Sequence, residues 1–481
     1  MLKKHRLFLM RNLTYSLNKI MKENLTIIIM GATGDLTKLK LLPSIYGLIK
    51  DKKVGKISII GAAFPETTAS AILDEAIINV PNVDLNIWDE LKRVFHYVRL
   101  DFNKVEDYTT LKLKIDEIEK AEGLPGNRLF YLATLPHHFD SITINLNRVK
   151  LINSKDGWQR VIYEKPFGYD LKSAKEINTS IAKFFPEKNT YRADHYLGKE
   201  LVSSISLFRF TNRIIEPLWS KRDIDSVQII LDEDFGIKNR GLYYDKYGAV
   251  RDIMQSHALQ ILALLAIESP KKINGEYVRD EKAKVLKKVK LKDIILGQYE
   301  GYTSEPDIKS DSKTETFFAA KLEINNSRWK GVPFFIRAGK NLSKKETTVH
   351  VRFKKVDCLL AKSCPADNNY LNLKIQPNEG FSFELNTKTQ NANYEVETII
   401  LDHSHGNKVS PNTPEAYSIL LEEAIKGEQS FFIRKDEMEY SWKIVDGIKI
   451  DKSKIFLYKK GSSGPKEMED WNMKNNINWK S

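Results

Sequence analysis

Gly31 and Gly34 stand where a chain could bind the phosphates of a dinucleotide. They follow residues 25–30 (LTIIIM), a short apolar run rich in β-branched residues, and precede a helical pattern of apolar residues from 36 to 49. Glycine lets backbone N–H groups approach a pyrophosphate, and the start of a helix favours negative charge. Because Gly-x-x-Gly-Asp-Leu differs from the usual Gly-x-Gly-x-x-Gly, an ordinary turn is the alternative interpretation.

His257 has the surroundings of a general base. It follows Val250 by seven residues and Ile253 by four, which places it on the apolar face of a helix predicted over residues 248–268. Burial disfavours the charged imidazolium, so a histidine there stays neutral and can accept a proton. A histidine of the packed core is the alternative. Asp252, five residues earlier, is expected to point away from His257 on an α-helix.

His195 and Lys199 have the spacing of a phosphate site. They are four residues apart and would share one face of a helix that begins near Tyr196, whose hydroxyl is a further donor. A stripe of surface charges is the alternative. Asp194 directly precedes this segment and has the side chain of a helix N-cap.

The order of elements predicts two units that position these residues. Strand patterns at 25–30, 57–61, 94–99, 128–132 and 161–163 are separated by helical segments such as 107–121. This alternation predicts an N-terminal Rossmann-like, doubly wound parallel sheet. Beyond Tyr196 the alternating segments 316–324, 347–354, 371–376 and 382–385 predict a large, mainly antiparallel sheet with covering helices.

Composition limits the possible functions. The chain has 481 residues, 42% hydrophobic and 29% charged, which is typical of a soluble globular protein with more than one core. Its net charge of +13 is spread along the chain, which favours an acidic small molecule over a nucleic acid. No stretch approaches the ~20 apolar residues that cross a bilayer. Cys358 and Cys364 exclude a disulfide framework and favour a reducing compartment.

Residues 1–22 carry six lysines and arginines and no acidic residue. The composition resembles an organellar transit peptide, and an upstream start with Met21 as the true initiator is the alternative. We expect a disordered basic extension over 1–23, a dinucleotide-binding domain over 24–195 and an α+β domain over 196–481.

Six segments resemble the glucose-6-phosphate dehydrogenase family, in the family's order. DHYLGKE followed by RDIMQSH is close to diagnostic, whereas EKP alone is shared with other Rossmann sugar dehydrogenases. The segments are GATGDLTKLKLLPSIYGL, YEKPFGYDL, YRADHYLGKE, RGLYYDKYGAVRDIMQSH, RWKGVPFFIRAGK and IQPNE.

The resemblance implies oxidation of glucose 6-phosphate at C1 to 6-phosphogluconolactone, with hydride transfer to NADP or NAD, as the first step of the pentose phosphate pathway. It also implies a cytoplasmic homodimer formed through the C-terminal sheet. No metal is required for this chemistry, and His403 and His405 are expected in a surface loop. A non-catalytic sugar-phosphate-binding paralogue is the alternative function.

The resemblance assigns roles residue by residue. His257 is the base, Asp194 orients it, and Lys165 contacts both substrate and nicotinamide, with Pro166 favouring an extended backbone there. The sugar-phosphate contacts are His195, Tyr196, Lys199, Glu233, Asp252, Lys340, Lys345 and Gln376. The coenzyme contacts are Gly31, Thr33, Gly34, Asp35, Leu36, Lys38, Phe64 and Lys165. Solvated side chains are the alternative for Glu233, Asp252, Gln376 and the lysines.

The sequence departs from the family after the second strand. NADP-using members typically read Gly-x-Ala-Arg, and the arginine holds the 2′-phosphate, whereas this chain reads Gly61-Ala62-Ala63-Phe64. Loss of a charge-assisted guanidinium contact costs about 1.5–3 kcal/mol. Glu66 stands two positions further on. The sequence therefore predicts relaxed or NAD-leaning coenzyme use, with Phe64 able to stack on the adenine.

Overall fold

The computed structural model describes residues 22–480 except 153–154, 357–365, 391–395, 405–413 and 449–453. Residues 1–21, both cysteines and His405 lie outside the described residues. His403, by contrast, lies in strand β14 opposite Phe381, so the expectation of a loop is wrong for this histidine. Across the described residues, no helix has both the length and the apolar character that crossing a membrane requires.

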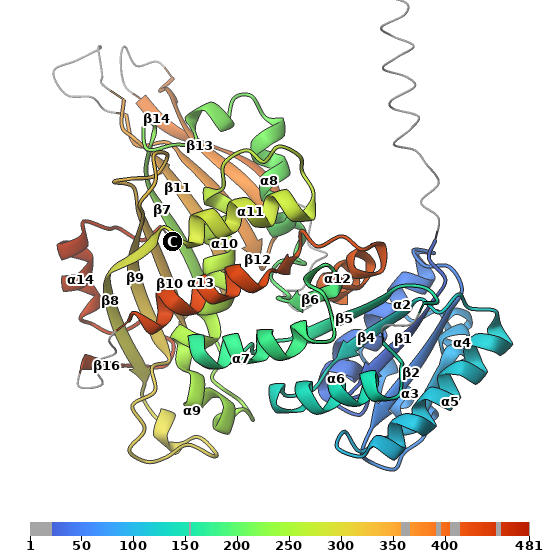
Figure 1. Cartoon of the computed structure of the whole chain (residues 1–481). Helices are drawn as coiled ribbons and strands as arrows, with labels where there is room; N and C mark the ends of the chain where they lie inside the picture. The colour runs from blue at the N-terminus through green and yellow to red at the C-terminus, as the bar shows by residue number, and fades with distance from the viewer. Residues whose placement is uncertain are drawn as a thin grey trace, which may run out of the picture.

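The first unit is a seven-stranded sheet covered by helices on both faces (Figure 1). All six residues of β1 are buried, as expected for a strand enclosed on both faces. Six strands are parallel, and β15, from near the C-terminus, joins antiparallel to β6. The strands, in sheet order, are β15 (Phe432–Ile433), β6 (Thr190–Ala193), β5 (Gln159–Glu164), β4 (Arg128–Leu132), β1 (Leu25–Met30), β2 (Ile57–Ala63) and β3 (Phe95–Arg99).

Two hydrophobic clusters separate the faces of this sheet. One face packs against α5, α6 and α7, and that cluster continues into the second unit. The other face packs against α2, α3, α4 and α12, the last returning from the C-terminal part of the chain. The helices are α2 (Leu42–Lys50), α3 (Ala69–Ile77), α4 (Leu85–Val94), α5 (Val105–Glu122), α6 (Phe139–Arg148), α7 (Leu171–Ala182) and α12 (Pro414–Lys426).

The second unit is built on a nine-stranded, mainly antiparallel sheet. The pairs β7–β10 and β8–β16 are parallel. In order, the strands are β14 (Val396–Ser404), β13 (Gly380–Lys388), β12 (Tyr370–Gln376), β11 (Glu346–Phe353), β7 (Ile224–Asp232), β10 (Pro333–Gly339), β9 (Phe317–Ile324), β8 (Val289–Tyr299) and β16 (Ile455–Tyr458).

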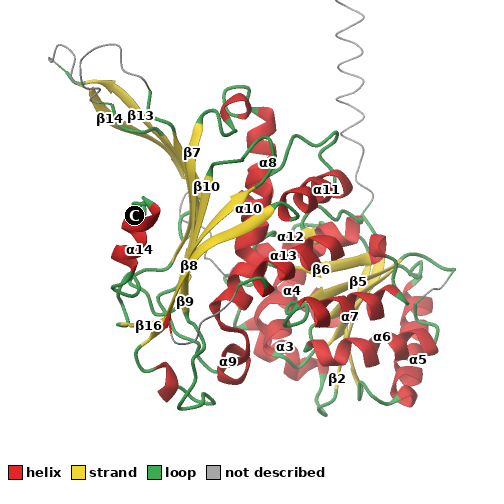
Figure 2. Cartoon of the chain, turned by 60° about the vertical axis from the view of Figure 1, so that its left-hand side comes forward, coloured by secondary structure: helices red, strands yellow, loops and turns green. Residues whose placement is uncertain are grey.

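Helices cover this sheet unequally (Figure 2). Most of them lie on the side that faces the first unit, and α14 packs Met468 and Trp471 on the opposite side. The helices are α8 (Glu200–Thr211), α9 (Gly241–Ala249), α10 (Leu259–Ala266), α11 (Gly275–Leu286), α13 (Lys435–Asp446) and α14 (Met468–Asn475). Inside this layer Lys282 of α11 and Glu437 of α13 form a fully buried ion pair, with Nζ and Oε2 2.8 Å apart.

The prediction of a single α-helix over residues 248–268 is wrong, because the chain kinks at Gly248 and part of the segment is a π-helix. Gly248 has φ +65° and ψ 176°, and a Cβ there would lie 2.4 Å from the Glu315 carboxylate, so the chain kinks at this glycine. A π-helix, η5 (Val250–Ala258), follows and continues as α10. Because a π-helix bonds i to i+5, residues five apart come to the same side, and Asp252 does not point away from His257 as expected.

The helix expected to begin near Tyr196 begins at Glu200. Residues 194–199 form a tight turn with successive i→i+3 backbone bonds, so His195 and Lys199 do not share a helical face. The Asp194 carboxylate accepts a hydrogen bond from Tyr196 N at 3.0 Å, which fixes the turn rather than capping a helix. The turn brings Asp194, His195 and Lys199 to one side of the first unit, beside η5.

Candidate active site

His257 and Asp194 meet across the two units. Asp194 follows β6 of the first sheet, whereas His257 lies on η5 of the second unit. The His257 Nδ1 lies 2.5 Å from Asp194 Oδ1, and their side chains are 2% and 1% exposed. Two residues that are 63 positions apart in the sequence are therefore in direct contact and almost completely shielded from solvent.

The electrostatics of this pair favour an anionic aspartate and a neutral histidine. Burial opposes ionisation of Asp194, but the charge and hydrogen bond of His257, with His195 and Lys165 nearby, hold the pKa of the carboxyl well below its usual range. Burial lowers the pKa of His257, although the Asp194 carboxylate raises it. The ring therefore carries its proton on Nδ1 and presents an unprotonated Nε2.

Lys165 lies on that unprotonated nitrogen. Its ammonium donates to His257 Nε2 at 2.9 Å and to Asp252 Oδ1 at 3.2 Å. Tyr243 also donates to Asp252 Oδ1, at 3.1 Å. Burial opposes ionisation of Asp252, yet the charges of Lys165 and Lys340 hold its pKa well below its usual range. Because η5 is a π-helix, Asp252 and His257 lie on the same side and both accept a hydrogen bond from the Lys165 ammonium.

Glu164, directly before Lys165, is a third buried acid at this site, after Asp194 and Asp252. Tyr131 donates its hydroxyl to Glu164 Oε1 at 2.5 Å. Burial raises the pKa of Glu164 to about 7. A carboxyl with a pKa near neutral therefore directly precedes Lys165 in the chain.

The predicted phosphate site contains more cations than the sequence suggested. Burial lowers the pKa of Lys199 to about 8, and the charge of Lys345 lowers it too. Burial also lowers the pKa of Lys40 on η1 (Thr37–Leu41), and Lys345 again contributes. The charge of Lys345 thus repels both Lys199 and Lys40, and this concentration of positive charge favours a bound anion.

The other sugar-phosphate candidates surround these lysines. Lys199 contacts Gln376 Oε1, and its Nζ lies 4.3 Å from the centre of the Tyr196 ring. Burial lowers the pKa of His195 well below its usual value, with the His257 ring centre 4.7 Å away. His195 is therefore a neutral donor rather than a second cation.

Lys340 and Glu233 form the far side of this group. They are in direct ion-pair contact, at the ends of β10 and β7. The ammoniums of Lys340 and Lys345 lie 5.4 and 5.2 Å from the centre of the Phe235 ring.

The glycine turn has features that fit a dinucleotide. Gly31 has φ +96°, and a Cβ there would lie 2.5 Å from the Ala133 carbonyl oxygen, so only glycine is accommodated. Gly34 accepts backbone bonds from Thr37 and Lys38, where the first helix starts. Beside Gly31, the buried Thr134 hydroxyl has no partner among the described residues. A tight glycine turn between a buried strand and the start of a helix is the arrangement that binds a pyrophosphate in such folds.

Phe64 and Lys38 have neighbours that the sequence did not reveal. Phe64 follows β2 and is 55% exposed, and the Arg99 guanidinium lies 5.0 Å from its ring centre. Lys38 Nζ lies 2.6 Å from Glu75 Oε2. Thr33 lies in the turn and Asp35 in the first helical residues, whereas Leu36 packs against the hydrophobic cluster that includes α2 and α3.

Tyr243, Lys40, Thr134 and Arg99 are the candidates that sequence reasoning missed. Lys40 and Tyr243 each lie inside a segment that carries the resemblance, GATGDLTKLKLLPSIYGL and RGLYYDKYGAVRDIMQSH respectively, so position was an available signal for both. Arg99 and Thr134 end or follow strands β3 and β4, whose carboxyl ends share the edge of β1 and β2. The rule that ligands bind at that edge could have found them.

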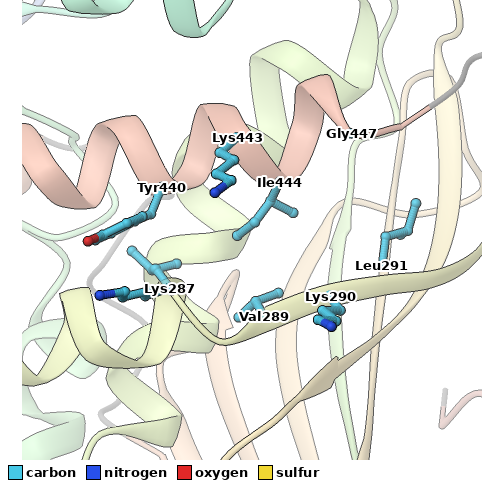
Figure 3. A pocket seen from close by; sticks show the side chains of 9 residues that line it. Lys287, Val289, Lys290, Leu291, Tyr440, Lys443, Ile444 and Gly447 are labelled. Carbon is cyan, nitrogen blue, oxygen red and sulfur yellow. The ribbon is translucent and has the colours of Figure 1, made fainter.

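Two other groups of residues resemble ligand sites. Asp194, His195 and His257 offer ligand atoms within 4.8 Å of one another, but the Nδ1–Oδ1 bond uses one atom from each of two residues, which favours proton transfer over metal binding. A hollow of about 470 Å³ between α13 and β8 is lined by Tyr440, Ile444 and exposed lysines (Figure 3). It shares no residue with the catalytic group.

Both halves of the chain match models of a known protein family. The model "Glucose-6-phosphate dehydrogenase, NAD binding domain" matches residues 28–204, and "Glucose-6-phosphate dehydrogenase, C-terminal domain" matches 206–480. Glucose-6-phosphate 1-dehydrogenase of Chlamydia pneumoniae is 39% identical over 92% of this chain and 93% of its own. The Bacillus subtilis (strain 168) enzyme is 37% identical over 94% and 97%. Other relatives are named cytoplasmic, from Arabidopsis thaliana, and chloroplastic, from Spinacia oleracea.

A solved structure extends the likeness to the fold. "Glucose-6-phosphate dehydrogenase in complex with its substrate glucose-6-phosphate" is 34% identical and covers 96% of this chain and 99% of its own, with a TM-score of 0.88. The predicted fold class, a parallel Rossmann-like unit followed by a mainly antiparallel one, is confirmed. With both halves matched and full-length relatives well above 30% identity, the chain belongs to the glucose-6-phosphate dehydrogenase family.

Proposed function

We propose that this chain oxidises glucose 6-phosphate at C1 to 6-phosphogluconolactone and passes the hydride to NADP or NAD, as the first step of the pentose phosphate pathway. The observation that carries the proposal is the buried contact between Asp194 and His257 Nδ1, which leaves Nε2 as an unprotonated base. A binding protein has no need of a base or of an aspartate to orient it, which disfavours the non-catalytic paralogue.

Proton removal falls to His257. The substrate C1 hydroxyl takes the place of Lys165 at Nε2 and transfers its proton there, while the C1–H bond breaks and the C1–O bond becomes a carbonyl. The nicotinamide, when bound, accepts the departing hydride at its C4. The imidazolium formed is stabilised by the Asp194 carboxylate, which is already ionised. Lys165, still paired with Asp252, stays beside the reacting oxygen.

Phosphate binding falls to Lys199, Lys345 and Lys40. The repulsion between Lys345 and the other two lysines is relieved when a dianion binds, which raises the pKa of Lys199 from about 8. His195 and Tyr196 add neutral hydrogen-bond donors. Binding energy from this remote group orients C1 against His257.

The sugar hydroxyls are left to the polar groups at the strand ends. Glu233 and Lys340 form a pair that can both donate and accept, and Gln376, in contact with Lys199, offers an amide. Asp252 accepts from a hydroxyl or from Lys165. Each of these residues is within the group of side chains that surrounds His257 and Lys199.

The coenzyme falls to the glycine turn. Gly31, Thr33, Gly34, Asp35 and Leu36 would hold the pyrophosphate through the turn and helix start. Phe64 would stack on the adenine, and Lys165 would contact the nicotinamide. Lys38 would contact the coenzyme while its ammonium remains in an ion pair with Glu75.

The chain is proposed to form a cytoplasmic homodimer through its second sheet. The outermost strand β14 exposes three consecutive apolar residues, Ile399, Ile400 and Leu401, at 39%, 64% and 53%. An exposed apolar edge strand is a site for pairing with another chain.

The test is the growth of NADPH or NADH absorbance when the protein and each coenzyme are mixed with glucose 6-phosphate. Turnover is expected with at least one coenzyme. Tight sugar-phosphate binding without turnover would instead support the non-catalytic paralogue.

A further inference from the structure

A guanidinium group lies beside the turn after β2, although no residue of the turn itself is an arginine. Arg99 is the last residue of β3, and its Cα pairs with that of Ala63 across the two parallel strands. From there the side chain crosses to Phe64, with the guanidinium carbon 5.0 Å from the ring centre. A cation therefore lies next to the position where the family carries an arginine.

The geometry of the turn is fixed from β3. The Tyr97 hydroxyl lies 2.9 Å from the Ala63 carbonyl oxygen and 2.5 Å from that of Pro65. Leu100 N donates to Ala63 O at 2.8 Å, directly after Arg99. The ring of Phe64 and the guanidinium of Arg99 are thus held together by the strands beneath them.

Arg99 is available for a ligand. Its side chain is 47% exposed, and its ion-pair partner, Glu66, is 89% exposed with Nε and Oε1 3.8 Å apart. An exposed pair at that distance contributes about 0–1 kcal/mol. A phosphate monoester carries a charge of about −1.5 to −2 and accepts two parallel N–H bonds from a guanidinium, so it displaces a single exposed carboxylate.

We propose that Arg99 binds the 2′-phosphate of NADP, in place of the arginine missing after Gly61-Ala62-Ala63, and that this chain prefers NADP. The proposal rests on the proposed function, because it assumes a dinucleotide at the glycine turn. In this fold the adenosine ribose lies at the carboxyl end of the second strand, where an arginine nearby accommodates the 2′-phosphate. Arg99 reaches that place from the third strand, and Phe64 leaves its exposed surface to the adenine. The NAD-leaning preference expected from the sequence considered only residues after β2.

The test measures coenzyme binding without sugar phosphate, so that it does not depend on turnover. Dissociation constants of NADPH and NADH are measured by their fluorescence for the wild type, Arg99→Ala and Arg99→Lys. Arg93→Ala is the matched control, since Arg93 is an exposed arginine on α4. Binding of 2′,5′-ADP gives the phosphate contact without the nicotinamide.

The expected result is NADPH binding weakened at least tenfold by Arg99→Ala, about 1.4 kcal/mol, with NADH binding changed less than twofold. Arg99→Lys keeps the charge but not the two parallel bonds and falls between. Phe64→Arg added to Arg99→Ala restores the preference for NADPH. Unchanged thermal unfolding checks that Arg99→Ala folds.

Three results would overturn the proposal: equal losses for NADPH and NADH, no loss for either, or a wild type that binds NADH as tightly as NADPH. Failure of the proposed function looks different. A chain that binds NADPH through Arg99 but does not oxidise glucose 6-phosphate would disprove the activity and leave the Arg99 contact standing.

Discussion

Replacing Asp194 by Asn removes the charge that stabilises protonated His257 while keeping the shape of the side chain. Two unit charges about 4 Å apart interact by about 4 kcal/mol at an effective dielectric constant of 20. Both side chains are nearly unexposed, so solvent screens this interaction little. A loss of 3–4 kcal/mol from the transition state lowers kcat by about 10²- to 10³-fold. An asparagine that presents its N–H₂ to Nδ1 would also favour the wrong tautomer and block Nε2.

The pH profile distinguishes this cause from general damage. The acidic limb of kcat/KM reports protonation of the free enzyme's base. Burial lowers the pKa of His257 and the Asp194 carboxylate raises it, so removing the carboxylate lowers this pKa further. The acidic limb of Asp194→Asn should therefore move to lower pH even though its plateau falls.

The assay is steady-state kinetics between pH 5 and 9, with thermal unfolding as a folding check. Asp89→Asn is the matched control, because the Asp89 side chain is 69% exposed. Turnover within tenfold of the wild type, or an acidic limb that moves to higher pH, would refute the reasoning.

Further predictions concern the phosphate site, a buried acid and a buried ion pair. Lys199→Ala should raise KM and lower kcat. The affinity of the wild type for the sugar phosphate should fall as pH rises through about 8, where Lys199 loses its proton. Lys199→Arg should abolish this fall in affinity, and a fall retained in Lys199→Arg would contradict the assignment. The pKa of Glu164 is raised to about 7 in the folded state, so the stability it contributes is complete below its pKa in the unfolded state and is lost as pH rises through 7. In urea unfolding, Glu164→Gln should therefore gain about 3 kcal/mol of unfolding free energy relative to the wild type between pH 4.5 and 7.5. Plots of unfolding free energy against pH that stay parallel for the two proteins would contradict this prediction. Lys282→Met leaves Glu437 buried without its cation and should cost about 3–5 kcal/mol, most of it regained in Lys282→Met/Glu437→Leu; a single-variant loss below 1 kcal/mol would argue against the pair.

The elements that position the site could be predicted from the sequence more completely than the local geometry of the site itself. Strand β4 has the predicted bounds, and β9 and β12 differ by one residue, because alternating or continuous apolar runs are local signals. The pairing of Asp194 with His257 came from the family resemblance, since no spacing rule joins residues 63 apart. The structure places the two side chains in direct contact.

The register of η5 could not be predicted from periodicity. Apolar residues spaced three and four apart fit an α-helix, whereas the chain kinks at Gly248, where Glu315 leaves no room for a Cβ, and continues as a π-helix. The turn over 194–199 depends likewise on tertiary contacts, as Gly198 approaches the Ala416 carbonyl oxygen too closely for a Cβ. Arg99 was missed because its partner, Phe64, lies on a neighbouring strand rather than nearby in sequence.

The most direct test of the central claim, that a neutral His257 held by Asp194 removes the proton from C1–OH, is His257→Asn assayed for turnover and for glucose 6-phosphate affinity. We predict that turnover is abolished while the dissociation constant of the sugar phosphate stays within a few-fold, since Lys199 and its neighbours remain. A His257→Asn enzyme with wild-type activity would contradict the account.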